Sequence, residues 1–213
     1  LVGADLFALS VAQRAEAHFV VTAIALGRSE LADLGKFLAR QRPLFFGSPG
    51  VGSPPHLAAE LFKRRAGIDA THVPYKGGGQ ALSDLMAGQL DFAIEGPTIV
   101  KPQVDAGRLR ALATTGTRRL SIWPSLPAAK ESIPDFEYLG WVGLALPSGT
   151  PPDVVSALHE ALMRVLVSEE AELWFAERGA SVGAQTAKDF VEFIRAEHRR
   201  WGELIREAGL LVP

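Results

Sequence analysis

The stretch "PLFFGSPGVGSPPHLAAELFKRRAGIDATHVPYKGGGQALSDLMAGQLDFAIEG", residues 43–96, alternates short apolar runs with longer amphipathic ones. The short runs are bounded by glycine and proline and indicate strands, whereas the longer runs have the spacing of helices. Strands are expected at 43–48, 70–75, 90–95 and 109–115, with helices at 54–67, 79–89 and 97–106 between them. This β-α-β-α-β-α-β order predicts right-handed crossovers and a largely parallel sheet.

The same signals predict further elements on both sides of this block. Strands are expected at 19–26, 139–147 (buried on both faces) and 180–184, and helices at 29–41, from Thr150 to about 167, from there to Arg178, and from Thr186 to about Gly209. Ser29, Thr150 and Thr186 are the expected helix caps, and Asp189 stands three residues after Thr186. The last helix carries one apolar face that is expected to pack in a core. The fold class is therefore α/β.

The composition excludes several classes of protein. The chain has 213 residues, 47% of them apolar and 22% charged, as in ordinary globular proteins. A net charge of −2 with both signs interspersed predicts no nucleic-acid partner. No cysteine is present, which excludes disulfides and thiolate chemistry and fits a periplasmic location. The five histidines lack the spacing of a metal site, and no cofactor is predicted.

The ends of the chain carry two further observations. The longest apolar run, at 19–27, has about half the length that a membrane-spanning helix needs. The chain begins at Leu1 and shows no leader, so a signal peptide is expected to have been removed or never to have existed.

Two glycine-rich loops, 47–53 and 76–79, follow neighbouring strands at their carboxyl ends, where ligands bind in open α/β sheets. Glycines let backbone N–H groups converge on an anion. An anion would be held by the amides near Gly50 and Gly52, the Ser53 hydroxyl and the amide of His56. The alternative is that the glycines and prolines only form tight turns between strand and helix.

Three known motifs fail at the first loop. Ser53 stands where a P-loop needs lysine, which disfavours nucleotide binding. Phe46 stands where a hydrolase elbow around Ser48 needs glycine. Pro54 and Pro55 occupy close-approach positions of the dinucleotide fingerprint.

The chain as a whole resembles the Bug/TctC family, the extracytoplasmic solute-binding receptors of tripartite tricarboxylate transport systems. The resemblance rests on "FFGSPGVGSPPHLAAELFKRRAGI", "HVPYKGGGQALSDLMAGQLDFAIEG", "AGRLRALATTGTRR", "GLALPSGTPPDVVSALHEAL" and "FIRAEHRRWGELIREAGL". It extends from about residue 5 onward and implies a type II periplasmic-binding-protein fold, with two α/β domains, a cleft between them and a bound carboxylate. It also implies a periplasmic location, a membrane permease or a sensor as partner, and no catalysis.

The family's binding loops correspond to defined positions here. The resemblance implies these ligand-binding residues: Ser48, Gly50, Gly52, Ser53, His56, Tyr75, Lys76, Gly77 and Glu95. His56 is expected to be a structural hydrogen-bonding residue, and Tyr75 to pack under its loop with a satisfied hydroxyl. Lys76 either attracts a carboxylate or is a solvated loop residue. Glu95 stands where the family often has aspartate; it either caps the next helix or binds a ligand hydroxyl or amine.

The expected domains are 43–137, which carries the loops, and a remnant of the other domain formed by 1–42 and 138–213. The family's opening strand and glycine-rich loop do not occur in these residues. An exposed edge on a sheet of 19–26, 139–146 and 180–184 would favour self-association.

Two other functions stay open. The effector domain of a transcription regulator shares this fold, and a serine hydrolase would use Ser48 and His56.

Overall fold

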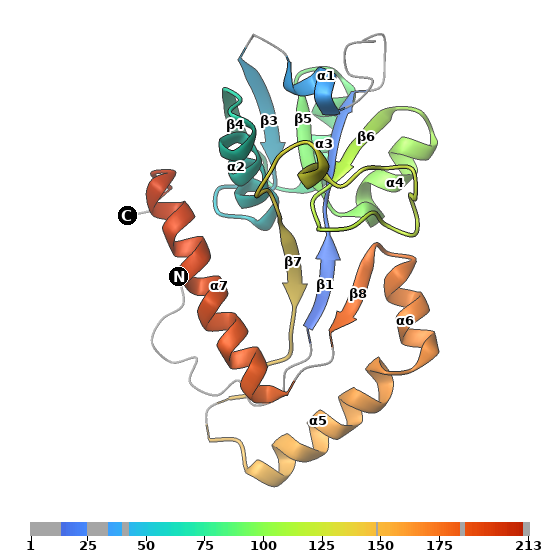
Figure 1. Ribbon diagram of the computed structural model, residues 1–213, viewed down its shortest axis with the longest axis vertical. Coiled ribbons are helices and arrows are strands. Elements are labelled where there is room, and N and C mark those ends of the chain that lie inside the picture. The colour runs from blue at the N-terminus through green and yellow to red at the C-terminus, as the bar shows by residue number, and fades with distance from the viewer. Residues whose placement is uncertain (1–13, 25–33, 40–42, 148, 184–185, 211–213) are drawn as a thin grey trace. The chain divides into compact units, whose positions relative to one another are not determined.

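The computed structural model describes residues 14–24, 34–39, 43–147, 149–183 and 186–210 (Figure 1). The chain divides into two compact units. Unit 1 is Leu1–Ala17 with Trp141–Leu204, and unit 2 is His18–Gly140 with Ile205–Pro213. The chain therefore passes between the units at 17/18, 140/141 and 204/205.

Unit 2 carries the alternating block and its flanking segments. Its strands are β2 Val20–Ile24, β3 Leu44–Ser48, β4 Ala70–Pro74, β5 Phe92–Glu95 and β6 Leu109–Thr114. Its helices are α1 Leu34–Leu38, α2 Pro54–Ala66, α3 Gly78–Met86 and α4 Pro97–Asp105, followed by a short 3-10 helix at Ala129–Glu131. The predicted strands and helices of the block are confirmed, with ends that differ by a few residues. Ser29 and the rest of 25–33 lie outside the described residues.

The five-stranded sheet of unit 2 has the order β4-β3-β5-β2-β6. β3 pairs in parallel with both β4 and β5, but β2 runs antiparallel between β5 and β6. The sheet is therefore mixed, and the prediction that 19–26 joins a sheet with 139–146 and 180–184 was wrong. The sheet whose exposed edge was expected to favour self-association therefore does not contain 19–26.

The division into units also differs from the expected one. The first boundary was expected at 41–43 and lies at 17/18, because β2 pairs inside the sheet of unit 2. The second lies at 140/141, at the end of the expected range 137–140, and the third, at 204/205, divides the segment 138–213 that was expected to belong to one domain.

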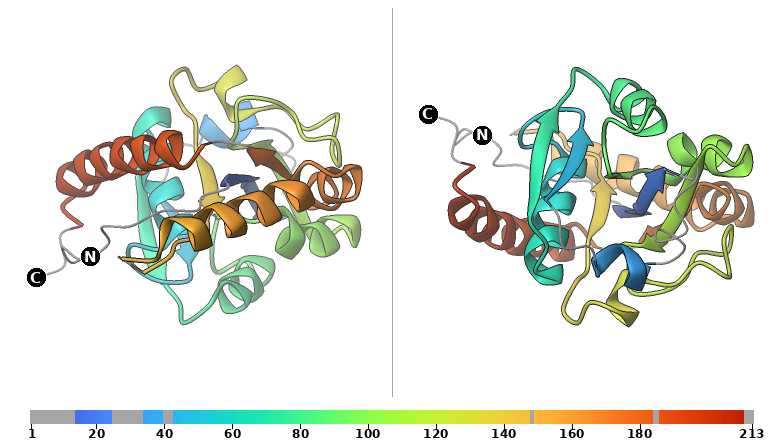
Figure 2. Two further views of the ribbon diagram at one scale, coloured as in Figure 1. Left: turned by 90° about the horizontal axis from the view of Figure 1, so that it is seen from below. Right: turned by 90° about the horizontal axis from the view of Figure 1, so that it is seen from above.

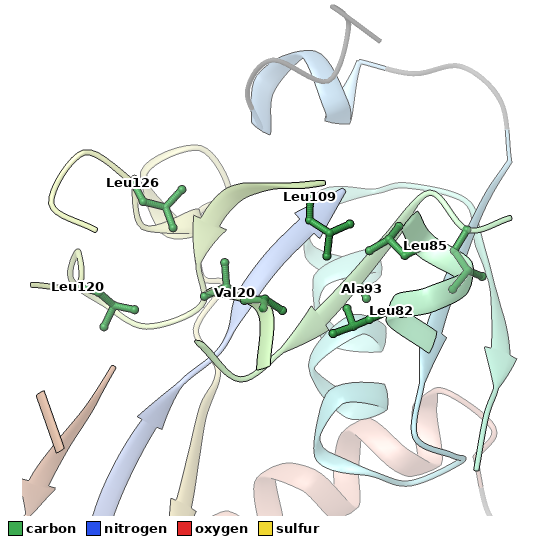
Figure 3. Close-up of a cluster of buried hydrophobic side chains, with 9 residues drawn as sticks. Val20, Leu82, Leu85, Ala93, Leu109, Leu120 and Leu126 are labelled. Carbon is green, nitrogen blue, oxygen red and sulfur yellow. The ribbon is translucent and has the colours of Figure 1, made fainter. Parts of the chain in front are cut away.

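Helices cover both faces of this sheet (Figure 2). On the face of α1 and α2, Phe37, Phe46, Phe62 and Phe92 are fully buried and pack ring against ring at 5.3 to 6.5 Å between centroids. On the face of α3 and α4 lies an aliphatic cluster that includes Val20, Leu82, Leu85, Ala93 and Leu109 (Figure 3). Burial of such side chains stabilises the unit by roughly 1.5–3 kcal/mol each. Alternate residues of β5 thus point to different cores, which places Phe92 against α2 and Ala93 against α3.

The start and end of α2 follow from local chemistry. Pro54 and Pro55 occupy its first turn, where the missing N–H groups cost nothing. Gly67 ends the helix in the left-handed conformation, φ 65°, as predicted.

A second sheet consists of β1 Arg14–His18, β7 Leu139–Val142 and β8 Ala180–Gly183 in the order β7-β1-β8. Most of its residues belong to unit 1, and the unit boundaries at 17/18 and 140/141 fall within β1 and β7. The helices of unit 1 are α5 Pro152–Leu166, α6 Glu169–Ala176 and α7 Ala187–Glu207. The predicted cap of α7 is confirmed, since the Asp189 amide donates to Thr186 Oγ1 at 3.2 Å. The expected Thr150 cap is not formed: its hydroxyl donates to the Pro147 carbonyl, and Pro151 precedes α5.

The expectation that 139–147 is buried on both faces was wrong. Trp141 packs edge-on against Phe190 and Phe193 of α7, so one side is covered. Val142, the last residue of β7, and Leu144, beyond its end, are 70% and 54% exposed. The apolar face of α7 is only partly enclosed: Phe190 and Leu204 are buried, and its other apolar side chains are half-buried.

Candidate functional site

The amides of the first loop, 48–53, donate hydrogen bonds to side chains of the loop itself and of the start of α2. The Gly50 amide donates to Ser48 Oγ at 3.2 Å, and the Gly52 amide donates to His56 Nδ1 at 3.0 Å. The His56 amide donates to Ser53 Oγ at 3.4 Å, while that hydroxyl donates to the Gly50 carbonyl at 2.7 Å. Gly52 has φ 77°, which favours glycine there. An anion at this loop would have to exchange these hydrogen bonds for its own.

Ser48 belongs to a histidine cluster made of Phe46, Ser48, His56 and His72. Ser48 Oγ and His72 Nε2 share a hydrogen bond of 2.7 Å, and the two imidazoles stack with ring centroids 3.9 Å apart. Phe46 stacks on His72 at 5.0 Å. The cluster lies on the α2 side of the sheet and ties β3, β4 and α2 together.

Both imidazoles of the cluster are uncharged at neutral pH. Burial, with smaller contributions from His56 and Lys63, lowers the pKa of His72 to about 4. Burial also lowers the pKa of His56, against the opposing effect of Glu60. His56 is confirmed as a structural hydrogen-bonding residue.

The geometry gives no support to the serine-hydrolase alternative. Ser48 is fully buried and its histidine partner is His72, not His56. Burial of the hydroxyl leaves no access for a substrate carbonyl, which a nucleophile must reach.

The second loop lies directly beside the first. The Tyr75 amide donates to the Ser48 carbonyl at 2.9 Å, which continues the β3–β4 pairing into the loops. The predicted adjacency of the two loops is therefore confirmed. Tyr75 donates its hydroxyl to Asp84 Oδ2 at 2.7 Å, so its expected partner exists, and burial together with this bond raises the pKa of Tyr75 to about 12. Lys76 is exposed.

The start of α3 differs from the first loop because no side chain caps it. Gly77 is the residue before the helix, and it makes no side-chain cap hydrogen bond. It has extended backbone, φ 177°, and a side chain there would meet nothing within 4 Å. The first-turn amides of a helix need acceptors and carry the positive end of its dipole. This turn is therefore a better place for an anion than loop 48–53.

Glu95 lies against the start of α3. It ends β5, is 3% exposed, and a Cβ on Gly78 would lie 3.0 Å from its Oε1. Oε1 is buried and has no hydrogen-bond partner. Burial raises the pKa of Glu95 to about 7, against the opposing effect of the Gly96 amide. Of the two roles left open for Glu95, a side-chain cap on the next helix, α4, is not formed.

The predicted site residues thus fall into two groups. Ser48 and the α2 residue His56 lie on the α2 side of the sheet, whereas Tyr75 and Glu95 lie on the α3 side with Lys76 and Gly77 in the loop between β4 and α3. Sequence reasoning missed His72 and Asp84 as partners of Ser48 and Tyr75. No spacing in the sequence marks His72, because its contact with Ser48 depends on the parallel register of β3 and β4.

Two kinds of feature are absent from the described residues. These residues contain no group of three or more His, Asp or Glu side chains placed to hold a metal ion. Among the helices described, none combines the length and the apolar character that crossing a bilayer requires.

Comparison with known proteins identifies relatives over nearly the whole chain. The family model described as "Tripartite tricarboxylate transporter family receptor" matches residues 8–210. A Pseudomonas knackmussii protein, "UPF0065 protein in clcB-clcD intergenic region", is 37% identical over 158 residues, 73% of this chain and 94% of its own length. BugT of Bordetella pertussis is 33% identical over 80% of this chain and 53% of its own length. The chain thus spans about half the length of BugT.

Two solved structures resemble this one. "R. palustris Rpa4515 with adipate" has a TM-score of 0.85 and 31% identity over 98% of this chain and 71% of that one. "Periplasmic binding protein BugD" has a TM-score of 0.78 and 24% identity over 94% of this chain and 69% of that one, and shows the fold alone. The predicted α/β fold of the periplasmic-binding-protein type is confirmed by these likenesses.

Proposed function

This chain belongs to the family of tripartite tricarboxylate transporter receptors, and we propose that it captures a small carboxylate as a solute-binding receptor. The family assignment confirms the resemblance to Bug/TctC proteins. The observation that carries the proposal is the likeness to Rpa4515, whose structure is described with adipate, over 98% of the chain. A dicarboxylate of that size is the ligand class we assign.

The binding residues of this proposal are those at the carboxyl ends of β3, β4 and β5. The uncapped turn at Gly77 supplies the amides, and Lys76 adds a positive charge beside it. Loop 48–53 contributes if its internal hydrogen bonds rearrange around the ligand, which involves Ser48, Gly50, Gly52, Ser53 and His56. Tyr75 positions the second loop through Asp84, and Glu95 faces the bound group.

The receptor acts in the periplasm and delivers its ligand to a membrane permease or a sensor, without catalysis. A composition free of cysteine and the family assignment support this role. Differential affinity of the ligand for two conformations is what such a receptor needs to report occupancy.

The test is a thermal-shift and calorimetric titration with adipate, succinate and the dimethyl ester of each. Binding to the native state alone stabilises it by about 2.7 kcal/mol at a hundredfold excess over Kd. We expect the acids to raise Tm and the esters to do nothing. Stabilisation by the esters or by neutral sugars, with no effect of either acid, would contradict the carboxylate assignment.

A matched pair of variants locates the site. Gly52 and Gly107 both have positive φ, 77° and 67°, and a Cβ on either would meet nothing within 4 Å. Gly52→Ala and Gly107→Ala therefore carry the same kind of backbone strain, about 1 kcal/mol. We expect only Gly52→Ala to weaken binding of adipate. Equal affinity of the two variants would remove loop 48–53 from the site.

A further inference from the structure

The start of α3 and the Glu95 carboxyl group form one unsatisfied polar arrangement. α3 has nine residues, and its first turn has neither a side-chain cap nor an acidic residue. Glu95 is 3% exposed, and its Oε1 is buried without a hydrogen-bond partner. A Cβ on Gly78 would lie 3.0 Å from this oxygen. A helix start attracts an anion, and a buried polar atom without a partner destabilises the fold unless a ligand supplies that partner. The two observations are independent and point to the same place.

We propose that Glu95 binds the ligand as a neutral carboxylic acid, donating a hydrogen bond from its own proton to a ligand carboxylate held at the first turn of α3. Capture of each ligand then takes up one proton from solution once Glu95 is ionised in the free protein. This inference rests on the proposed function and names the protonation state in which the site recognises its ligand.

The neutral form follows from what surrounds Glu95. An ionised carboxylate at this depth needs a cation or several hydrogen bonds, because desolvation of a charge costs several kcal/mol. The Gly96 amide is the one interaction that opposes burial in setting its pKa, which is about 7. A ligand carboxylate placed beside it would add a like charge and raise the pKa further, as in pairs of carboxyl groups that share one proton.

The charged groups on the neighbouring elements are engaged with partners other than Glu95 or are exposed. In α2, His56, Glu60 and Lys63 interact with one another, and in α4 Lys101 pairs with Asp105 at 2.7 Å. Asp84 of α3 accepts from Tyr75, and Asp91, before β5, accepts from the Phe45 amide at 2.9 Å. Lys76 and Arg110 are exposed, and β2 and β3 carry no titratable side chain.

Proton uptake distinguishes this arrangement from the two alternatives. If Glu95 were ionised and accepted hydrogen bonds from a ligand amine or hydroxyl, binding would release no proton at high pH and would strengthen as pH rises. If it only supported the fold, the ligand would not change its protonation. If Glu95 binds as the acid, affinity weakens as pH rises and binding takes up a proton at high pH, because only the protonated receptor binds.

The experiment is isothermal titration calorimetry of the full chain with adipate and succinate between pH 6 and 9, in buffers of different ionisation enthalpy. We expect Kd to be constant below about pH 7 and to rise about tenfold per pH unit above it, with uptake approaching one proton per ligand at pH 8. Glu95→Gln keeps a donor without a titrating group and should bind with a pH-independent Kd. Asp69→Asn, an exposed position in the same unit, should keep the wild-type profile.

Three results would overturn the inference. Binding without proton uptake overturns it and leaves the proposed function intact, as does affinity that rises with pH and is lost in Glu95→Gln. No binding of either dicarboxylate at any pH overturns the proposed function and this inference with it. Proton counting on the wild-type chain decides the matter even if Glu95→Gln fails to fold.

Discussion

Glu95→Gln is expected to stabilise unit 2 at neutral and alkaline pH, with no ligand present. The pKa of Glu95 is about 7 in the folded protein, against an ordinary value of 4.5. Between these two values the folded state holds a proton that the unfolded state has lost. Stability therefore falls with rising pH by about 1.4 kcal/mol per unit. Over the whole interval the loss reaches about 3 kcal/mol, and it is complete above pH 7.

Glutamine removes this loss because an amide stays neutral at every pH. The free energy of unfolding, from urea titrations followed by circular dichroism, should differ little between wild type and Glu95→Gln below pH 4.5. The difference should then grow in favour of the variant to about 3 kcal/mol above pH 7. Asp69→Asn makes the same exchange of carboxylate for amide at an exposed position and should show no such growth.

Either of two results would refute this reasoning. A difference that favours wild type as pH rises would mean that ionised Glu95 accepts hydrogen bonds from the first turn of α3 and caps it, whereas a flat difference would mean that burial does not raise its pKa. In the first of these cases the amides of that turn would be occupied by Glu95 and would not bind a ligand carboxylate.

Three further predictions test the packing. Phe92→Ala should cost about 3–5 kcal/mol in urea titrations, since Phe92 is fully buried among Phe37, Phe46 and Phe62, whereas a loss under 1 kcal/mol would mean that the ring cluster is loosely packed. The imidazole of His72 should titrate by NMR near pH 4, so stability should fall as pH drops from 6.5 to 4; a midpoint near 6.5 would contradict its burial. Gly143→Ala would overlap the ring of Phe190 and should raise hydrogen exchange in unit 1, while Gly79→Ala, which meets nothing within 4 Å, should not.

Local chemistry was enough to predict the block from β3 to β6. Gly67 and the prolines of α2 mark a helix start and end that need no distant partner. The position of β2 could not be obtained in this way, because its apolar run fits any buried strand. Its partners lie far along the chain: Thr22 Oγ1 donates to the Ala93 carbonyl, 71 residues away, and the Phe19 amide donates to Thr115 Oγ1, 96 residues away.

The position of the candidate site could be predicted from the sequence, but its contacts could not. The two loops were expected side by side because parallel strands place their carboxyl ends at one edge. The internal hydrogen bonds of loop 48–53 could not be predicted, because the sequence indicates that the amides converge but not which acceptor each amide binds. His72 had no distinctive spacing, and its contact with Ser48 depends on strand register. The burial of Glu95 depends on how closely α3 approaches β5, which Gly78 permits.

The place of β2 between β5 and β6 has a consequence during synthesis. Residues 20–24 are made first, but their second partner strand ends at Thr114, some ninety residues later. At about 5–20 residues per second, at least one edge of this apolar strand stays unpaired in the nascent chain for roughly 5–20 s. During that interval it is a ready partner for other strands or for a chaperone. A chain that started at residue 43 would never fill that gap, and both β5 and β6 would keep an open edge. We therefore expect that a soluble form of unit 2 needs the segment from His18 onward in addition to 43–137.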